Sequence, residues 1–103
     1  MRVWHEEVFG PVLPIITFST YEEGIEKAND TEYGLGATIF TEDTEIVTRA
    51  TRDIQSGMIK VNSTGFSRPE NPFGGVKKSG IGRENGTYGF KDVTQIKVIA
   101  TEK

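Results

Sequence analysis

The sequence predicts an α/β fold, because short apolar runs rich in branched residues alternate with two segments of helical periodicity. Between Val12 and Asn62 the order is strand, helix, strand, helix, strand, which is typical of crossover units in a parallel-type sheet. A chain of 103 residues has the length of one domain, and neither a linker nor a repeat divides it. We therefore expect a single unit, residues 1–103, that forms a partial three-layer sheet with crossover helices.

The first strand is predicted at Val12–Phe18, where Pro14 places it at a sheet edge or near the start of the strand. The hydroxyl residues at positions 19–20 are expected to cap the helix that follows. A glutamate at positions 22–23 then completes a capping box, and Asn29-Asp30 is expected to end the helix.

The second strand is predicted at Ala37–Thr41, and the clearest helix follows it at Glu42–Gln55. Four apolar residues recur on one face of that helix, while charged and hydroxyl residues occupy the remainder. Gly57 stands at the position of a C-terminal cap. Met58–Asn62 is then predicted as the third strand.

Residues 63–71 are mostly polar, which predicts a surface loop. Further along, Asn85–Val93 is compatible with a short helix. Gln95–Thr101 is rich in branched residues, and Lys97 faces opposite to its neighbours in the alternation. This pattern predicts a final strand at a sheet edge.

The segment Asn71–Glu84 is rich in glycine, yet it matches neither common phosphate-binding fingerprint. From Gly80 to Gly86 the spacing is one residue too long for G-x-G-x-x-G. The Walker pattern requires glycine before Lys-Ser, and here Lys77 occupies that position. The residues alone therefore favour glycines that let a loop cross closely packed elements.

Composition argues against several kinds of partner and site. The net charge of −3 gives no reason to expect a nucleic-acid surface. No apolar run approaches the roughly 18 residues of a membrane span, and no leader opens the chain, so we expect a cytoplasmic protein without membrane contact. The chain has no cysteine, and His5 is its one histidine, so we expect neither thiol chemistry nor a metal site.

Taken in order, the short motifs of this chain resemble successive landmarks in the C-terminal part of the aldehyde dehydrogenase family. That family oxidises aldehydes to carboxylic acids with NAD or NADP. The resemblance covers essentially the whole chain. The motifs that carry it are Glu7-Val8-Phe9-Gly10-Pro11-Val12, Tyr33-Gly34-Leu35, Val61-Asn62, Pro72-Phe73-Gly74-Gly75 and Gly82-Arg83-Glu84.

The resemblance implies a cofactor role for two residues near the N-terminus. Glu7 matches the glutamate that hydrogen-bonds the ribose hydroxyls beside the nicotinamide, a task that suits a carboxylate because it accepts from two vicinal hydroxyls. Phe9 matches an aromatic residue that packs near the nicotinamide ring. The residues alone also allow ordinary structural interpretations, in which Glu6 and Glu7 are a solvated acidic pair and Phe9 is a core residue.

The resemblance also implies substrate-facing residues further along the chain. Phe73 matches an aromatic residue that lines the aldehyde tunnel, and Phe66 and Ser67 fall in the loop that varies with substrate. Glu84 matches a glutamate proposed in some members to relay protons to the general base. Alternatives remain open, since Phe73 is equally a packing residue and Glu84 equally a surface charge beside Arg83.

The absence of cysteine conflicts with this resemblance, because the nucleophile of the family is a cysteine. We therefore expect a C-terminal fragment that is inactive alone and binds no cofactor tightly alone. Its expected partner is another copy of the chain or the missing part of the enzyme, since Gln95–Thr101 resembles the strand that contacts a neighbouring subunit. The alternative is a non-catalytic module that associates with itself.

Overall fold

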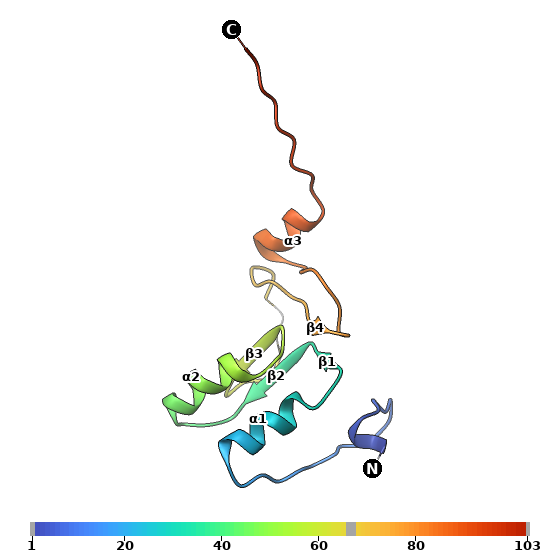
Figure 1. The fold of residues 1–103 in the computed structure, drawn as a ribbon, viewed down its shortest axis with the longest axis vertical. Coiled ribbons are helices and arrows are strands. Elements are labelled where there is room, and N and C mark those ends of the chain that lie inside the picture. The colour runs from blue at the N-terminus through green and yellow to red at the C-terminus, as the bar shows by residue number, and fades with distance from the viewer. Residues whose placement is uncertain (1, 66–67, 103) are drawn as a thin grey trace.

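The computed structural model describes residues 2–65 and 68–102, and its centre is the crossover unit that the sequence predicts (Figure 1). Strand β2 (Gly36–Ile39) leads into helix α2 (Thr44–Asp53), which returns the chain to strand β3 (Met58–Val61). The two strands pair in parallel over their full length, with Ala37 opposite Ile59. The α/β class and this crossover are confirmed.

Helix α1 (Tyr21–Asn29) begins with the predicted capping pattern. The Thr20 hydroxyl accepts a hydrogen bond from the backbone N–H of Glu23 at 3.2 Å. The Glu23 carboxylate in turn accepts from the backbone N–H of Ser19 at 2.8 Å. Both bonds satisfy amide groups that the first turn of a helix leaves without partners. The expected end of the helix at Asn29-Asp30 is also confirmed.

A second small sheet differs from the predicted parallel arrangement. Strand β1 (Tyr33–Gly34) pairs antiparallel with strand β4 (Val76–Lys77), which lies in the glycine-rich segment. The Ser79 hydroxyl adds to this pairing by accepting from the Gly34 N–H at 2.9 Å. The described residues thus form two sheets of two strands each, and not one three-layer parallel sheet.

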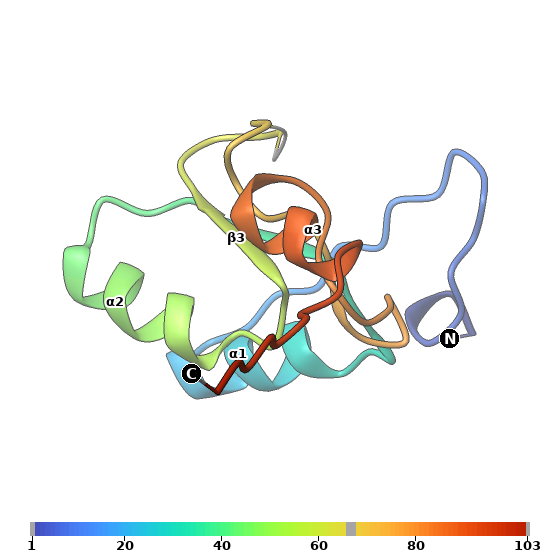
Figure 2. The same cartoon turned by 90° about the horizontal axis from the view of Figure 1, so that it is seen from above.

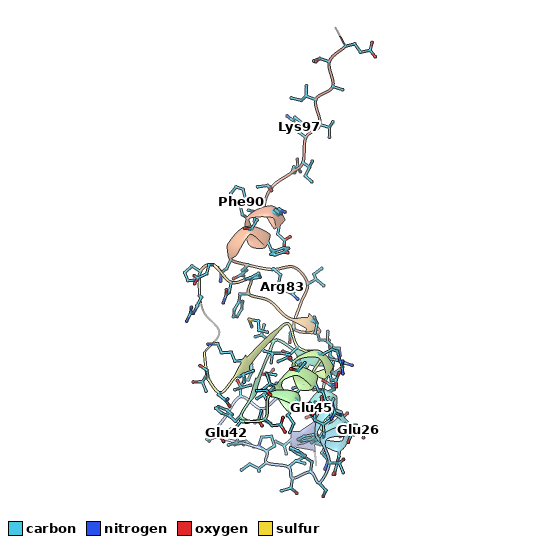
Figure 3. All side chains as sticks on the ribbon, turned by 90° about the vertical axis from the view of Figure 1, so that its left-hand side faces the viewer. Glu26, Glu42, Glu45, Arg83, Phe90 and Lys97 are labelled. Carbon is cyan, nitrogen blue, oxygen red and sulfur yellow. The ribbon has the colours of Figure 1, made fainter. Side chains whose placement is uncertain are left out.

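The predictions of a strand at Val12–Phe18 and of a last strand at Gln95–Thr101 are wrong for this structure, since neither segment forms a strand. Both run extended with exposed apolar side chains, and Ile96 is 97% exposed. The C-terminal segment leaves helix α3 (Gly86–Asp92) as a single extended chain, with Lys97 on it (Figures 1 and 3). A sequence with β-propensity forms a strand only when a neighbouring strand accepts its backbone hydrogen bonds, and none lies beside these segments among the described residues.

Gly57 has a different role from the helix cap that the sequence predicts. Helix α2 is capped at Ile54, and its end precedes Gly57. A Cβ atom on Gly57 would lie 2.0 Å from the carbonyl oxygen of Gly74. The glycine is therefore required because the backbone of the glycine-rich segment crosses it closely, which confirms the close-crossing interpretation of that segment.

Polar side chains join α1 to α2. The Tyr21 hydroxyl donates to the Asp53 carboxylate at 2.7 Å, and the Arg49 guanidinium lies 3.9 Å from the centre of the Tyr21 ring. The Asn29 amide donates to the Asp53 carbonyl oxygen at 2.9 Å and accepts from the Gln55 N–H at 2.8 Å. Asn29 thereby ties the end of α1 to the end of α2.

The chain is elongated and has little apolar core. Among the described residues Ala50 is the one buried hydrophobic residue, at 3% exposure. The radius of gyration is 18.2 Å, against about 13 Å for a compact domain of this length. Helix α2 and the N-terminal segment, with its short 3-10 turn η1 (Arg2–Trp4), lie at opposite ends of the body (Figures 1 and 2). No helix among the described residues has the length and apolar character to span a membrane.

The close crossing at Gly57 gives a stability prediction. Gly57→Ala forces the backbones apart, and we expect it to lower the free energy of unfolding by about 1–3 kcal/mol. Gly10→Ala is the matched control, because the nearest atom to its Cβ among the described residues would be Cγ1 of Val8, at 3.9 Å. Urea denaturation followed by circular dichroism measures both variants, and equal midpoints for the two would contradict the role of Gly57.

The ion pairs of the helices give a pH prediction. The hydrogen bond from Lys27 holds the pKa of the Glu23 carboxyl below its ordinary value, and the hydrogen bond from Arg52 does the same for the pKa of Asp53. Carboxyls with a lowered folded-state pKa stabilise the chain above the pKa of the unfolded state, about 4, and this contribution is lost as pH falls through the lower folded-state values.

We therefore expect the thermal midpoint to fall as pH decreases below about 4.5, and the fall to be smaller in Asp53→Asn. Glu42→Gln is the control, because the Glu42 carboxylate has no ion-pair or hydrogen-bond partner within the described ranges. Thermal melts across that pH range provide the measurement. A D53N profile that overlays the parent profile would contradict the prediction.

Candidate functional site

Glu7 and Phe9 lie on the exposed segment that follows η1. Phe9 is 94% exposed, so it is not a core residue in this structure. Glu6 forms an ion pair with Arg2 at 3.0 Å, whereas Glu7 has no hydrogen-bond or ion-pair partner within residues 2–65 and 68–102. The two adjacent acids therefore differ, and the Glu7 carboxylate is the one available to a ligand.

Two hollows meet at Glu7. One of about 390 Å³ also contains Phe9 and Tyr33 in its lining. The other, of about 540 Å³, reaches from Trp4 and Glu7 across β1 to Lys78 and Ser79. The structure thus brings the predicted cofactor residues against the β1–β4 sheet, although they lie far from it in sequence.

Lys78 contributes the positive charge of the larger hollow. Its ammonium group pairs with the Glu32 carboxylate, and this hydrogen bond raises the pKa of Lys78 above its ordinary value. Lys77 beside it donates to the carbonyl oxygens of Asn29 at 2.9 Å and Thr31 at 3.1 Å. No spacing in the sequence predicted these partners.

Phe73 and Glu84 are brought together by a backbone bridge. The N–H of each donates to the carbonyl oxygen of the other, at 2.8 Å and 2.7 Å. Both line a hollow of about 280 Å³, with Phe73 half-buried and Glu84 exposed. A half-buried aromatic wall beside a carboxyl therefore results from the folding of the glycine-rich segment.

Arg83 fixes the turn between Phe73 and Glu84. Its guanidinium donates to the carbonyl oxygens of Gly75 at 2.8 Å and Gly82 at 2.7 Å, and its N–H donates to the Asp92 carboxylate at 2.8 Å. Figure 3 shows Arg83 in the stretch that leads up to α3. The Arg83 side chain is therefore used in structural contacts, whereas the side chain of its neighbour Glu84 is exposed.

The residues predicted to face the cofactor and those predicted to face the substrate lie on neighbouring surfaces. Leu35 and Ser79 line both the 540 Å³ hollow that contains Glu7 and the 280 Å³ hollow that contains Phe73 and Glu84. The two groups share no hollow within the described residues. Leu35 therefore lies at the boundary between the two hollows.

Asn62 positions the start of the loop at residues 63–71. Its side chain accepts from the Thr41 N–H at 2.9 Å and donates to the Thr41 carbonyl at 2.8 Å, which extends the β2–β3 pairing by one rung. Its backbone has φ of 52°, a conformation that favours asparagine or glycine. Asn62 therefore has a structural role at this position. Phe66 and Ser67, predicted in the same loop, lie outside the described residues.

The chemistry of this surface fits a nucleotide ribose better than a metal ion. An unpaired carboxylate accepts hydrogen bonds from two vicinal hydroxyls, and the exposed Phe9 ring two residues away offers a face to a planar ring. The described residues contain no cluster of histidine, aspartate or glutamate that could hold a metal ion.

Comparison with known proteins gives a consistent match. A sequence model described as the aldehyde dehydrogenase family matches residues 1–99. The peroxisomal aminoaldehyde dehydrogenase 1 of Pisum sativum is 44% identical over 99 residues, which are 96% of this chain and 20% of that protein. The chain therefore spans about a fifth of the length of the curated relatives it matches.

Solved structures agree in both fold and sequence. An NAD-dependent aldehyde dehydrogenase from Sinorhizobium meliloti superposes with a TM-score of 0.90 at 44% identity, over 94% of this chain and 19% of that one. A betaine aldehyde dehydrogenase from Staphylococcus aureus in complex with NAD+ superposes with a TM-score of 0.85 at 39% identity, over 89% of this chain and 18% of that one.

Proposed function

The chain belongs to the aldehyde dehydrogenase family, and we propose that it supplies cofactor- and substrate-facing residues to the NAD(P)-dependent oxidation of an aldehyde to a carboxylic acid. In this proposal it is part of the C-terminal region of such an enzyme. The observation that supports it most directly is the unpaired Glu7 carboxylate beside the exposed Phe9 ring. The NAD+ complex of the Staphylococcus aureus relative supports the choice of cofactor.

On the cofactor side, Glu7 accepts hydrogen bonds from the two hydroxyls of the nicotinamide ribose. Charged acceptors form stronger hydrogen bonds than neutral ones, so this contact orients the ribose as well as holding it. Phe9 packs its ring near the nicotinamide and excludes water from that side. The bound nicotinamide supplies one step of the chemistry, which is acceptance of a hydride from the substrate.

On the substrate side, Phe73 lines the path of the aldehyde, and Phe66 and Ser67 contribute to the loop that selects it. An apolar wall orients a carbonyl and keeps bulk water out. Glu84 accepts and returns a proton at its carboxyl, which passes it toward the general base of the enzyme. The backbone bridge between Phe73 and Glu84 keeps the wall and the proton carrier side by side.

The thiol nucleophile of the reaction comes from outside these residues, because the sequence contains no cysteine. Residues 1–103 alone are therefore inactive and bind the cofactor weakly in this proposal. Their partner is the remaining part of the enzyme or another copy of the chain. The exposed apolar segments 12–18 and 95–101 support either partner, since each offers an unpaired backbone edge.

A non-catalytic module that associates with itself is the second candidate function. The observation that favours it is the C-terminal segment 95–101, which is extended and exposed over its whole length. Both candidates bury this segment against a partner. They differ in whether the chain restores activity to an enzyme that lacks the corresponding region.

Replacement of that region in a relative tests the proposed function. In the hybrid, residues 1–99 replace the matching segment of the Sinorhizobium meliloti dehydrogenase. We expect the hybrid to reduce NAD+ with an aldehyde, and we expect the isolated chain to give no reduced cofactor, because it has no thiol. Absorbance of the reduced nicotinamide measures both. A folded hybrid without activity would contradict the proposal in favour of the self-association module.

Substitution of Glu7 tests the cofactor contact in the same hybrid. Glu7→Gln removes the charge from the acceptor, and we expect the KM for NAD+ to rise about tenfold, since a hydrogen bond to a charged group contributes about 1.5–3 kcal/mol. Glu6→Gln is the matched control, because Glu6 is already paired with Arg2. Steady-state kinetics give both constants, and equal values for E7Q and E6Q would contradict the assignment.

A further inference from the structure

The N-terminal segment that carries Glu7 has few attachments to the remainder of the chain. The backbone bonds of η1 close within the segment, from the N–H groups of His5 and Glu6 to the carbonyl of Arg2 at 2.9 and 2.8 Å. The Arg2–Glu6 ion pair is also internal to it. The position of Glu7 relative to the sheet therefore depends on bonds that leave the segment.

Such a bond joins Trp4 to Asp30. The indole N–H of Trp4 donates to the Asp30 carboxylate at 3.0 Å across 26 residues of sequence. Within the described residues it is the one hydrogen bond from residues 2–12 to an element beyond the segment. Trp4 is half-buried, so its ring also contributes contact area at this point.

The location of Asp30 indicates that its carboxylate has a specific role. Asp30 is the C-terminal cap of α1, where the helix dipole places partial negative charge and disfavours an acidic side chain. Its backbone N–H makes the capping bond to the carbonyl of Lys27, and the side chain takes no part in that bond. The carboxylate is thus free to accept from Trp4, and this bond offsets its unfavourable position.

We propose that Trp4 and Asp30 are positioning residues for cofactor binding, because their hydrogen bond holds the segment that presents Glu7. This inference rests on the proposed cofactor role of Glu7. Glu7 is three positions after Trp4 in the sequence, so their Cα atoms lie within about 11 Å of each other. Trp4 and Glu7 also line the same 540 Å³ hollow. Loss of the Trp4–Asp30 hydrogen bond would let Glu7 move away from the position at which it binds the ribose hydroxyls.

The contact is tested first in the intact chain. Trp4 is its one tryptophan, so indole fluorescence reports on this residue alone. We expect Asp30→Ala to move the emission to longer wavelength and to increase quenching by acrylamide, because the ring becomes more exposed. Asp30→Asn keeps an acceptor oxygen and is the matched control, with emission close to that of the parent. Identical spectra for D30A and the parent would overturn the contact.

The effect on the cofactor is then tested in the hybrid dehydrogenase by calorimetric titration with NAD+, a readout that does not require turnover. We expect Trp4→Phe and Asp30→Ala each to raise the Kd for NAD+ about threefold to tenfold, with Asp30→Asn within about twofold of the parent. The W4F/D30A double variant is expected to match either single variant, because the two residues act through one bond. The aldehyde KM is expected to stay unchanged.

The outcomes separate this inference from the proposed function. Unchanged Kd values for W4F and D30A, in a hybrid where Glu7→Gln weakens NAD+ binding, would overturn the positioning role alone. Additive effects in the double variant would also overturn it, since they show that the residues act separately. If Glu7→Gln leaves the Kd unchanged, the cofactor role of Glu7 fails, and the positioning inference fails with it.

Discussion

The close contact between glycine backbones holds this structure together. Gly57 meets the carbonyl of Gly74, and a Cβ on Gly34 would lie 2.6 Å from the carbonyl of Gln55. Because Gly34 and Gly57 carry no side chain, the glycine-rich segment can lie directly on the crossover unit, and its strand β4 can pair with β1. The Phe73–Glu84 bridge and the approach to α3 follow from that placement. A feature that resembles a phosphate-binding loop in composition is thus a packing device.

The second constraint is the small amount of apolar surface that the chain buries. Helices α1 and α2 are joined by charged and amide side chains, and Ala50 is the one buried hydrophobic residue among those described. Exposed ion pairs contribute little to stability, so we expect the chain to need further burial of apolar surface. The extended segments 12–18 and 95–101 have the apolar side chains and open backbone edges that a larger assembly would cover.

Local signals in the sequence predicted the elements that local interactions form. Thr20 and Glu23 cap α1 as expected, and the apolar stripe and parallel crossover of α2 are present. The strands at 12–18 and 95–101 were predicted wrongly, because a strand depends on a partner that composition does not reveal. The β1–β4 pair was not predicted, since two-residue strands have no periodicity to detect.

The candidate site was predicted less from residue chemistry than from resemblance to a family. Glu7 and Phe73 each had an ordinary structural explanation until the ordered motifs were considered together. The bond between Trp4 and Asp30 had no sequence signal at all, because it joins residues 26 positions apart. Side-chain partners at that separation depend on the three-dimensional path of the chain, and only the structure reveals them.

In the proposed function, this segment presents Glu7 to a nicotinamide ribose within a larger dehydrogenase. A crystal structure of the hybrid enzyme with bound NAD+ would show whether Glu7 contacts the ribose. We expect both oxygens of the Glu7 carboxylate to lie within about 3.2 Å of the ribose hydroxyls, with the Phe9 ring beside the nicotinamide. A cofactor bound in that enzyme with Glu7 turned to solvent on another surface would contradict it.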